Sequence, residues 1–136
     1  MIRDIVKDII FLQQKAAPAE KTDRPIADDL KDTLAAHSDT CVGLAANMIG
    51  YAKAIIAIRN GKDILIMYNP QLLSAASPYE TEEGCLSLSG KRPCTRYEII
   101  EVKYRDEQFR PKKKKFKAFT AEIIQHEMDH LQGILI

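Results

Sequence analysis

The chain has 136 residues, 46% of them hydrophobic and 29% charged, with a formal net charge of +1. These values are typical of a single globular domain over residues 1–136, and they exclude a global charge bias toward nucleic acid or membrane. The first ten residues, MIRDIVKDII, include four charged side chains and therefore lack the apolar run of a signal peptide. No stretch approaches the roughly 20 apolar residues of a membrane span. We expect a cytoplasmic protein.

The first part of the chain predicts one amphipathic helix. Residues 1–20 are expected to be irregular or partly helical. Over residues 22–36, apolar side chains recur at three- and four-residue steps, with Thr22 or Asp23 as a candidate cap. A loop of small residues is expected over 42–47, after which the pattern changes to that of strands.

The middle of the chain predicts antiparallel strands. Apolar runs at 52–58 and 63–73 flank Asn60-Gly61, a dipeptide typical of hairpin turns. Residues 96–106 alternate well enough to form a strand, and 109–119 is its expected partner. The run PKKKKFK within this partner is expected to be a solvated strand or turn rather than a polyanion site.

Helical spacing returns over residues 120–131, with Thr120 as the expected cap and Gly133 as the stop. The chain contains no repeat and no linker. The pattern of the whole chain therefore predicts two main helices and a set of antiparallel strands.

The last predicted helix contains the sequence QHEMDH. His126 and His130 are four residues apart, so their imidazoles lie on one helix face within reach of a single metal ion. Glu127 lies beside them, where it can accept a proton from a metal-activated water. Alternatively, the two histidines and the glutamate are polar residues of an amphipathic helix and have no role in metal binding. The sequence contains only three histidines, which makes that alternative the weaker one.

A site of this kind needs a third protein ligand, and few residues follow His130. The third ligand is therefore expected upstream, and thiolate is the strongest binder among the candidates for a borderline or soft ion. Cys85 follows Gly84, which gives the backbone freedom to turn a side chain toward a site, whereas Cys94 is better suited to a buried structural role. The candidates are His37, Cys41, Cys85, Cys94 and the carboxylates.

Three segments together carry a resemblance to a known family. They are CVGLAANM at 41–48, EGCLS at 83–87 and QHEMDHLQG at 125–133, in that order along the chain. The chain resembles a peptide deformylase, and the resemblance covers nearly its whole length. It implies a compact α+β fold in which antiparallel strands surround a central helix that bears both histidines.

The resemblance also implies roles for individual residues. Cys85, His126 and His130 would bind one divalent transition metal ion, with Fe²⁺ the native choice and Zn²⁺ or Ni²⁺ as substitutes. Glu127 would be the general acid and base, and the N–H of Leu86 would donate to the substrate's formyl oxygen. The substrate would be the N-formylmethionyl end of a nascent chain, with ribosome proximity but no direct nucleic-acid specificity. Its binding residues would be Val42, Gly43, Leu44, Glu83, Gly84, Glu122 and Ile123.

The first motif departs from the family pattern at two positions. Cys41 stands where the family has glycine, and Met48 where it has glutamine. In the family that glutamine donates to the formyl oxygen, whereas a thioether has no proton to donate. Loss of one such donor typically lowers the rate by about 10²- to 10³-fold.

Two further departures concern the pocket and the length. Glu122 lies one helical turn before His126, where the family usually has an apolar residue lining the pocket for the methionine side chain. Alternatively, Glu122 points to solvent in the first helical turn. The chain is also shorter at both ends than typical members.

Two functions remain open from the sequence. The first is a peptide deformylase with activity reduced by Met48. The second is a metal-binding, deformylase-like protein that binds peptides or partners without efficient deformylation. A zinc peptidase of another fold is disfavoured because the EGCLS segment would be unexplained.

Overall fold

The computed structural model describes all residues, 1–136, as three α-helices, two 3₁₀ helices and five strands. The α-helices are α1 (Ile9–Leu12), α2 (Arg24–Ala36) and α3 (Ala118–Leu131). The 3₁₀ helices are Lys21–Asp23 and Ala46–Ile49. The strands are β1 (Gly43–Ala45), β2 (Ile55–Asn60), β3 (Asp63–Cys85), β4 (Leu88–Arg105) and β5 (Pro111–Lys117).

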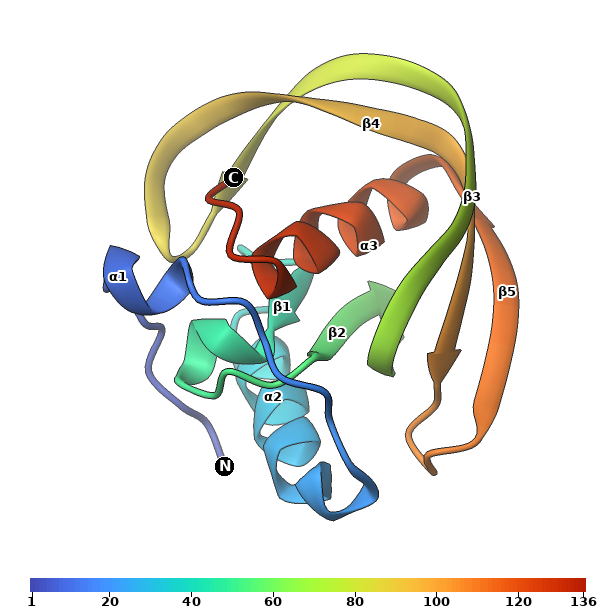
Figure 1. Ribbon diagram of the computed structural model, residues 1–136. Helices are drawn as coiled ribbons and strands as arrows, with labels where there is room; N and C mark the ends of the chain where they lie inside the picture. The colour runs from blue at the N-terminus through green and yellow to red at the C-terminus, as the bar shows by residue number, and fades with distance from the viewer.

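The five strands form one antiparallel sheet in the order β1-β2-β3-β4-β5. The long strands β3 and β4 form a curved ribbon that arches over α3 (Figure 1). Register shifts interrupt this ribbon between Tyr68 and Gln71, between Leu72 and Ser74, and at Gly84. Bulges bend a strand and increase its twist, which explains how two such long strands curve around a helix.

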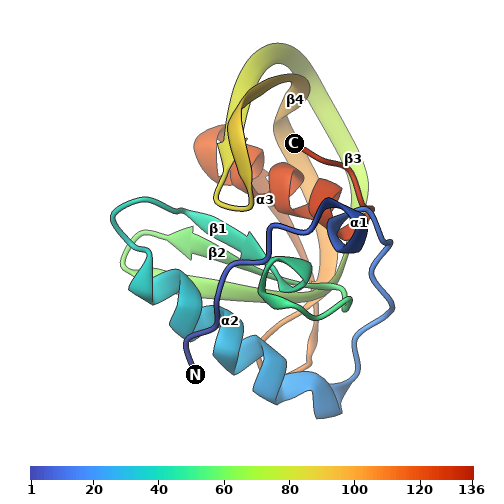
Figure 2. The same cartoon turned by 90° about the vertical axis from the view of Figure 1, so that its left-hand side faces the viewer.

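Two helices cover opposite sides of the short strands β1 and β2, with α2 on one side and α3 on the other (Figure 2). The amphipathic helix α2 buries Ala27, Leu30 and Leu34 against them. In contrast, α3 is buried over most of its surface, because the ribbon covers the side that faces away from β1 and β2. A core of 23 buried hydrophobic residues joins these layers, which leaves α3 at the centre of the molecule.

Most predicted elements are confirmed, but several boundaries differ. The predicted strand over 63–73 extends to Cys85, and the one over 96–106 begins at Leu88. The added ribbon is mostly exposed and lacks the alternation of apolar residues that marks a half-buried strand. Ladder hydrogen bonds and the tight connection between the two strands hold it in place instead.

Three local predictions were wrong. The helix α3 begins at Ala118, so Thr120 lies inside it, and the true cap, Lys117, makes no side-chain hydrogen bond to the helix. The two-residue hairpin turn is Gly61-Lys62 and not Asn60-Gly61, since Asn60 pairs with Asp63. The expected loop over 42–47 contains strand β1, because Gly43 to Ala45 pair with β2.

None of the helices combines the length and the apolar character that crossing a membrane requires.

Candidate functional site

Three potential metal ligands converge at the centre of the molecule. Donor atoms of Cys85, His126 and His130 all lie within 4.8 Å of one another. The two histidines come from adjacent turns of α3, and their Nε2 atoms are 3.0 Å apart. Cys85 comes from the end of β3, where the sharp return into β4 directs its side chain toward α3. The structure thus brings together the three residues that the resemblance indicated.

The other candidates for a third ligand lie outside this cluster. His37 follows α2, and its Nδ1 is 2.9 Å from the carbonyl oxygen of Thr33. The Cys41 thiol donates to the carbonyl of Gly43 at 2.9 Å, and burial raises its pKa to about 11. Cys94 is half-buried on the ribbon, not in the core as expected. All three cysteines are free thiols. Of the three, Cys85 is the one positioned beside the histidines.

A buried network orients the His126 ring. Its Nδ1 lies 2.7 Å from a carboxylate oxygen of Glu83, which leaves Nε2 facing His130. Glu83 also accepts hydrogen bonds from Arg96, at 2.7 to 3.1 Å, and Arg96 donates to Asp129 at 2.7 Å. Hydrogen bonding of one ring nitrogen to a carboxylate is the usual way in which proteins set the tautomer and direction of a metal-binding histidine.

Further polar contacts hold α3 against its surroundings. The side chain of Gln125 bonds to both backbone groups of Tyr97 on β4, each at 2.8 Å. The amide of Asn47 donates to the carbonyl of His130 at 2.8 Å. These bonds fix the rotation of α3, and with it the direction of both imidazoles.

The ionisation of the two histidines differs because their partners differ. Burial opposes charge on His126, but hydrogen bonding with Cys85 and Glu83 outweighs it and raises the His126 pKa to about 10. Burial and the neighbouring His126 lower the pKa of His130 to about 3. The imidazole of His130 is therefore neutral at pH 7, with a lone pair available to an ion.

Glu127 lies beside the cluster in a desolvated position. Burial raises its pKa to about 7, partly offset by His126, and its Oε1 is buried without a hydrogen-bond partner. A carboxylate that titrates near neutral pH is suited to accept and return a proton. A Cβ at Gly43 would lie 2.7 Å from Ile123 and 3.0 Å from the Glu127 carboxylate, so only glycine allows β1 to approach α3 this closely.

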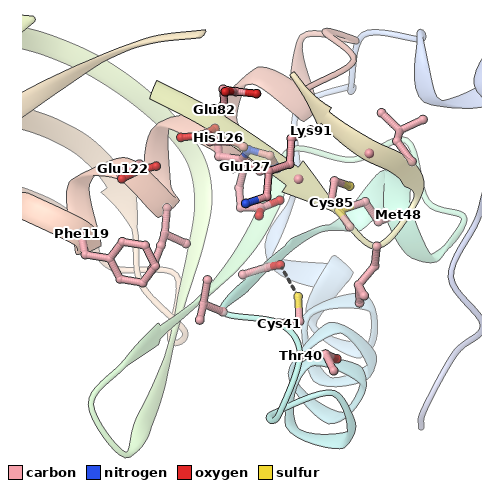
Figure 3. A pocket seen from close by; sticks show the side chains of 18 residues that line it. Thr40, Cys41, Met48, Glu82, Cys85, Lys91, Phe119, Glu122, His126 and Glu127 are labelled. Carbon is pink, nitrogen blue, oxygen red and sulfur yellow. Dashed lines mark hydrogen bonds and ion pairs between the residues drawn. The ribbon is translucent and has the colours of Figure 1, made fainter. Parts of the chain in front are cut away.

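A pocket of about 590 Å³ opens onto these residues. In Figure 3, Phe119 and Glu122 lie toward one end of the pocket and Met48 and Cys85 toward the other, with Glu127 between them. The expected residues Val42, Gly43, Gly84, Leu86 and Ile123 also line it. Leu44 does not, because it is fully buried in the core.

The two unusual positions of the sequence both line this pocket. Met48 is buried, and its sulfur accepts a hydrogen bond from the N–H of Ala45 at 3.5 Å. Glu122 is half-buried in the pocket wall, where it accepts a hydrogen bond from the Tyr79 hydroxyl at 3.3 Å. Burial and the neighbouring Glu122 raise the pKa of Tyr79 to about 12, so this hydroxyl keeps its proton at pH 7.

Several residues of the site were missed from the sequence. Lys91 and Phe119 line the pocket, and the side chain of Lys91 extends into it (Figure 3). Arg96 carried only a partial signal, because it shares the even-numbered face of the buried residues Ile100, Val102 and Tyr104, but the exposed Glu98 interrupts the pattern. Glu83 was expected to bind substrate, but its carboxylate is already engaged by His126 and Arg96.

The fold and the site together define a class of protein. Two imidazoles and one thiolate leave coordination positions open, and a buried carboxylate stands beside them in a pocket. This is the arrangement of a metal-dependent hydrolase rather than of a closed structural metal site.

Comparison with known proteins identifies the family within this class. The polypeptide deformylase family matches residues 2–136. A peptide deformylase of Clostridium beijerinckii is 57% identical over 136 residues, which cover 100% of both chains. The chain therefore belongs to the polypeptide deformylase family, and it is a hydrolase.

Solved structures agree with this assignment. A peptide deformylase from Legionella pneumophila superposes with a TM-score of 0.88 at 31% identity, covering 99% of this chain and 83% of that one. A class I type b peptide deformylase from Acinetobacter baumannii, bound to Met-Ala-Ser, gives a TM-score of 0.87 at 29% identity and covers 99% and 97% of the two chains. The predicted α+β fold is confirmed.

Proposed function

We propose that this protein removes the N-formyl group from the initiator methionine of nascent polypeptides, at a rate reduced by Met48. The observation that carries this proposal is the meeting of Cys85, His126, His130 and Glu127 at one pocket. The similar Acinetobacter baumannii protein binds Met-Ala-Ser, a peptide that begins with methionine. We place the protein in the cytoplasm, with nascent chains near the ribosome as its substrates.

The donor set fits one divalent transition metal ion. Imidazole and thiolate together suit iron, zinc and nickel better than magnesium or calcium, and we propose ferrous iron as the native ion. Cys85, His126 and His130 would hold it, with His126 releasing its Nε2 proton to make room for the ion and Glu83 keeping the ring in place. When bound, such an ion polarises a carbonyl oxygen and makes water nucleophilic at neutral pH.

Glu127 would move the proton in this reaction. Its unpartnered oxygen can accept a proton from the attacking water and pass it to the amine that leaves, so that formate and a free N-terminus are the products. Its raised pKa, about 7, allows both transfers near neutral pH. The buried position keeps bulk water from competing for the proton.

In the proposed reaction, fewer hydrogen-bond donors would stabilise the negative charge that develops on the formyl oxygen than in the family pattern. The backbone N–H of Leu86 remains as a donor in this proposal. The sulfur of Met48 already accepts a hydrogen bond from Ala45 and has no proton to donate. The reduced rate follows from this single missing donor.

The alternative is a metal-binding peptide binder without efficient deformylation, and Met48 is the observation that favours it. Formate release from formyl-Met peptides by the iron-loaded protein separates the two functions. Measurable release that disappears in Glu127→Ala supports the enzyme. Release no faster than in that variant, with peptide binding retained, supports the binder.

The purified protein is expected to hold about one transition-metal ion per chain. Cys85→Ser, His126→Ala and His130→Ala should each remove most of the metal, because each deletes one of three donors. Elemental analysis with a thiol count is the measurement, and Cys94→Ser is the matched control that should retain the ion. Full metal content in Cys85→Ser with loss in Cys94→Ser would show that the wrong thiol was chosen.

Replacing Glu122 with isoleucine is expected to tighten the binding of formyl-Met peptides, or of hydroxamates with a butyl side chain, by about threefold to tenfold. An apolar group would then no longer be buried against a carboxylate, which is a gain of about 1 kcal/mol. Inhibition constants provide the measurement. Glu98→Ile, an exposed position on β4 outside the pocket, is the control and should leave affinity unchanged. Equal affinities in all three proteins would exclude Glu122 from the side-chain pocket.

A further inference from the structure

The edge strand β5 concentrates positive charge that the catalytic proposal does not use. All five of its lysines are exposed, although the whole chain has a net charge of only +1. Only one of them has a carboxylate within reach, since Lys112 lies 3.9 Å from Asp106. The lysines of the strand are Lys112, Lys113, Lys114, Lys115 and Lys117.

The strand register places three of these lysines on one face with a fourth from β4. Lys113 stands directly opposite Lys103, and Lys115 and Lys117 follow on the same face. Alternate residues of a strand are about 7 Å apart, so their ammonium groups form a row. The only carboxylate opposite this row is Glu101, across from Lys115, and it makes no ion pair. The face therefore carries a row of three lysines along β5, with Lys103 beside Lys113 and one carboxylate, Glu101, beside Lys115.

Protection of a sheet edge explains only part of this charge. Lysines on an edge strand discourage pairing with another chain, but this purpose does not call for a lysine on the strand beside the edge. Lys103 is on the interior strand β4, and its position opposite Lys113 is destabilising because like charges face each other. A ligand with several negative charges would remove this repulsion.

The position of β5 connects this row to the pocket. The strand runs directly into α3, and Phe119, the second residue of that helix, lines the pocket. Figure 1 shows β5 at the outer edge of the sheet, joined to the start of the central helix. A polyanion along β5 would therefore lie beside one end of the pocket without filling it.

The sequence alone indicated only a solvated strand here, but the pairing of Lys103 with Lys113 adds a charge from β4. We propose that Lys103, Lys113, Lys115 and Lys117 form a docking surface for the phosphate backbone of RNA, without sequence preference. The choice of RNA rests on the proposed function, because a nascent chain is presented next to RNA. A membrane is a poorer match, because the aromatic side chain of β5, Phe116, is half-buried and packs against Tyr104 with ring centroids 6.4 Å apart. Among the β4 residues paired with β5, Ile99, opposite Lys117, is the single exposed large apolar side chain. Its charge is complementary to a regular row of phosphates.

The test is binding of fluorescent single-stranded polyuridine RNA at several salt concentrations, with full-length protein. The variant Lys113→Gln/Lys115→Gln/Lys117→Gln removes three charges from the row. Lys7→Gln/Lys15→Gln/Lys21→Gln removes three from exposed positions elsewhere and is the matched control. Loss of three phosphate contacts on a single strand should make the slope of log K against log salt shallower by about 2. At fixed salt, affinity should fall at least about tenfold in the first variant and much less in the control.

Three outcomes would overturn the proposal. They are binding without salt dependence, equal losses in the two triple variants, and binding to phosphatidylserine vesicles but not to RNA. The assay needs no turnover, so failure of deformylation would leave its result standing. Formate release from a free formyl-Met tripeptide should be the same in the first triple variant and the unmodified protein, because the row lies outside the pocket.

Discussion

Replacing Met48 with glutamine is expected to raise formate release from a formyl-Met peptide by about one to three orders of magnitude, mainly in kcat. The thioether lines the pocket and accepts a hydrogen bond from Ala45, so it cannot stabilise a developing oxyanion. A glutamine amide of similar length would place two N–H donors in the same region. Steady-state kinetics of the metal-loaded proteins provide the measurement.

Two further variants isolate the cause of this gain. Met48→Leu has similar volume and no donor, so it should show no increase. Glu127→Ala in the Met48→Gln background should abolish the increase, because a polarised carbonyl still needs proton transfer. A gain well below tenfold would contradict the account of a single missing donor and direct attention to the polar end of the pocket at Glu122.

Replacing Arg96 with methionine is expected to lower the free energy of unfolding by about 3–5 kcal/mol. The side chains of Arg96 and Glu83 are only 5% and 7% exposed, so the change would leave a buried carboxylate without its main partner. Glu83 also orients His126, so metal affinity should fall by about 10- to 100-fold. Urea unfolding and metal titration measure the two effects separately.

The matched control for this change is Arg110→Met, at an exposed arginine whose side chain forms no ion pair. It should change the free energy of unfolding by less than about 0.5 kcal/mol. Adding Glu83→Gln to Arg96→Met should recover part of the stability, because the unpaired buried charge is then removed. Equal effects of the two single arginine variants would contradict the importance of the buried pair.

The same pair predicts how stability depends on pH. Burial raises the pKa of Glu83, but hydrogen bonds from His126 and Arg96 outweigh burial and hold it well below its ordinary value of 4.5. A carboxyl group with a lowered folded-state pKa stabilises the fold above its unfolded-state pKa, and this contribution is lost as the pH falls below that value. The loss of stability on acidification should therefore be smaller in Arg96→Met than in the unmodified protein.

Local patterns were sufficient to predict the two long helices and two of the three candidate metal ligands. The spacing of His126 and His130 depends only on helix geometry, so it could be read directly from the sequence. The amphipathic pattern of α2 gave its position for the same reason. Cys85 was indicated by the family resemblance of its motif, because residue chemistry alone left several thiols and carboxylates as alternatives.

Local sequence patterns could not predict how far the β3–β4 ribbon extends or which side chains surround the metal ligands. The outer parts of β3 and β4 are exposed, so their pairing depends on hydrogen bonds between segments and not on a pattern of apolar residues. The cap of α3 was also misplaced, because Lys117 ends β5 and leads directly into the helix.

The sequence by itself determined the family, the α+β class, the two histidines with their neighbouring glutamate, and the presence of a thioether, Met48, in the first motif. Only the tertiary structure decided that Glu122 faces the pocket, because its direction depends on Tyr79 from the ribbon that crosses above α3. It likewise decided that Glu83 supports His126 through a buried network with Arg96. These contacts join residues far apart in the chain, and no local spacing specifies which of them meet.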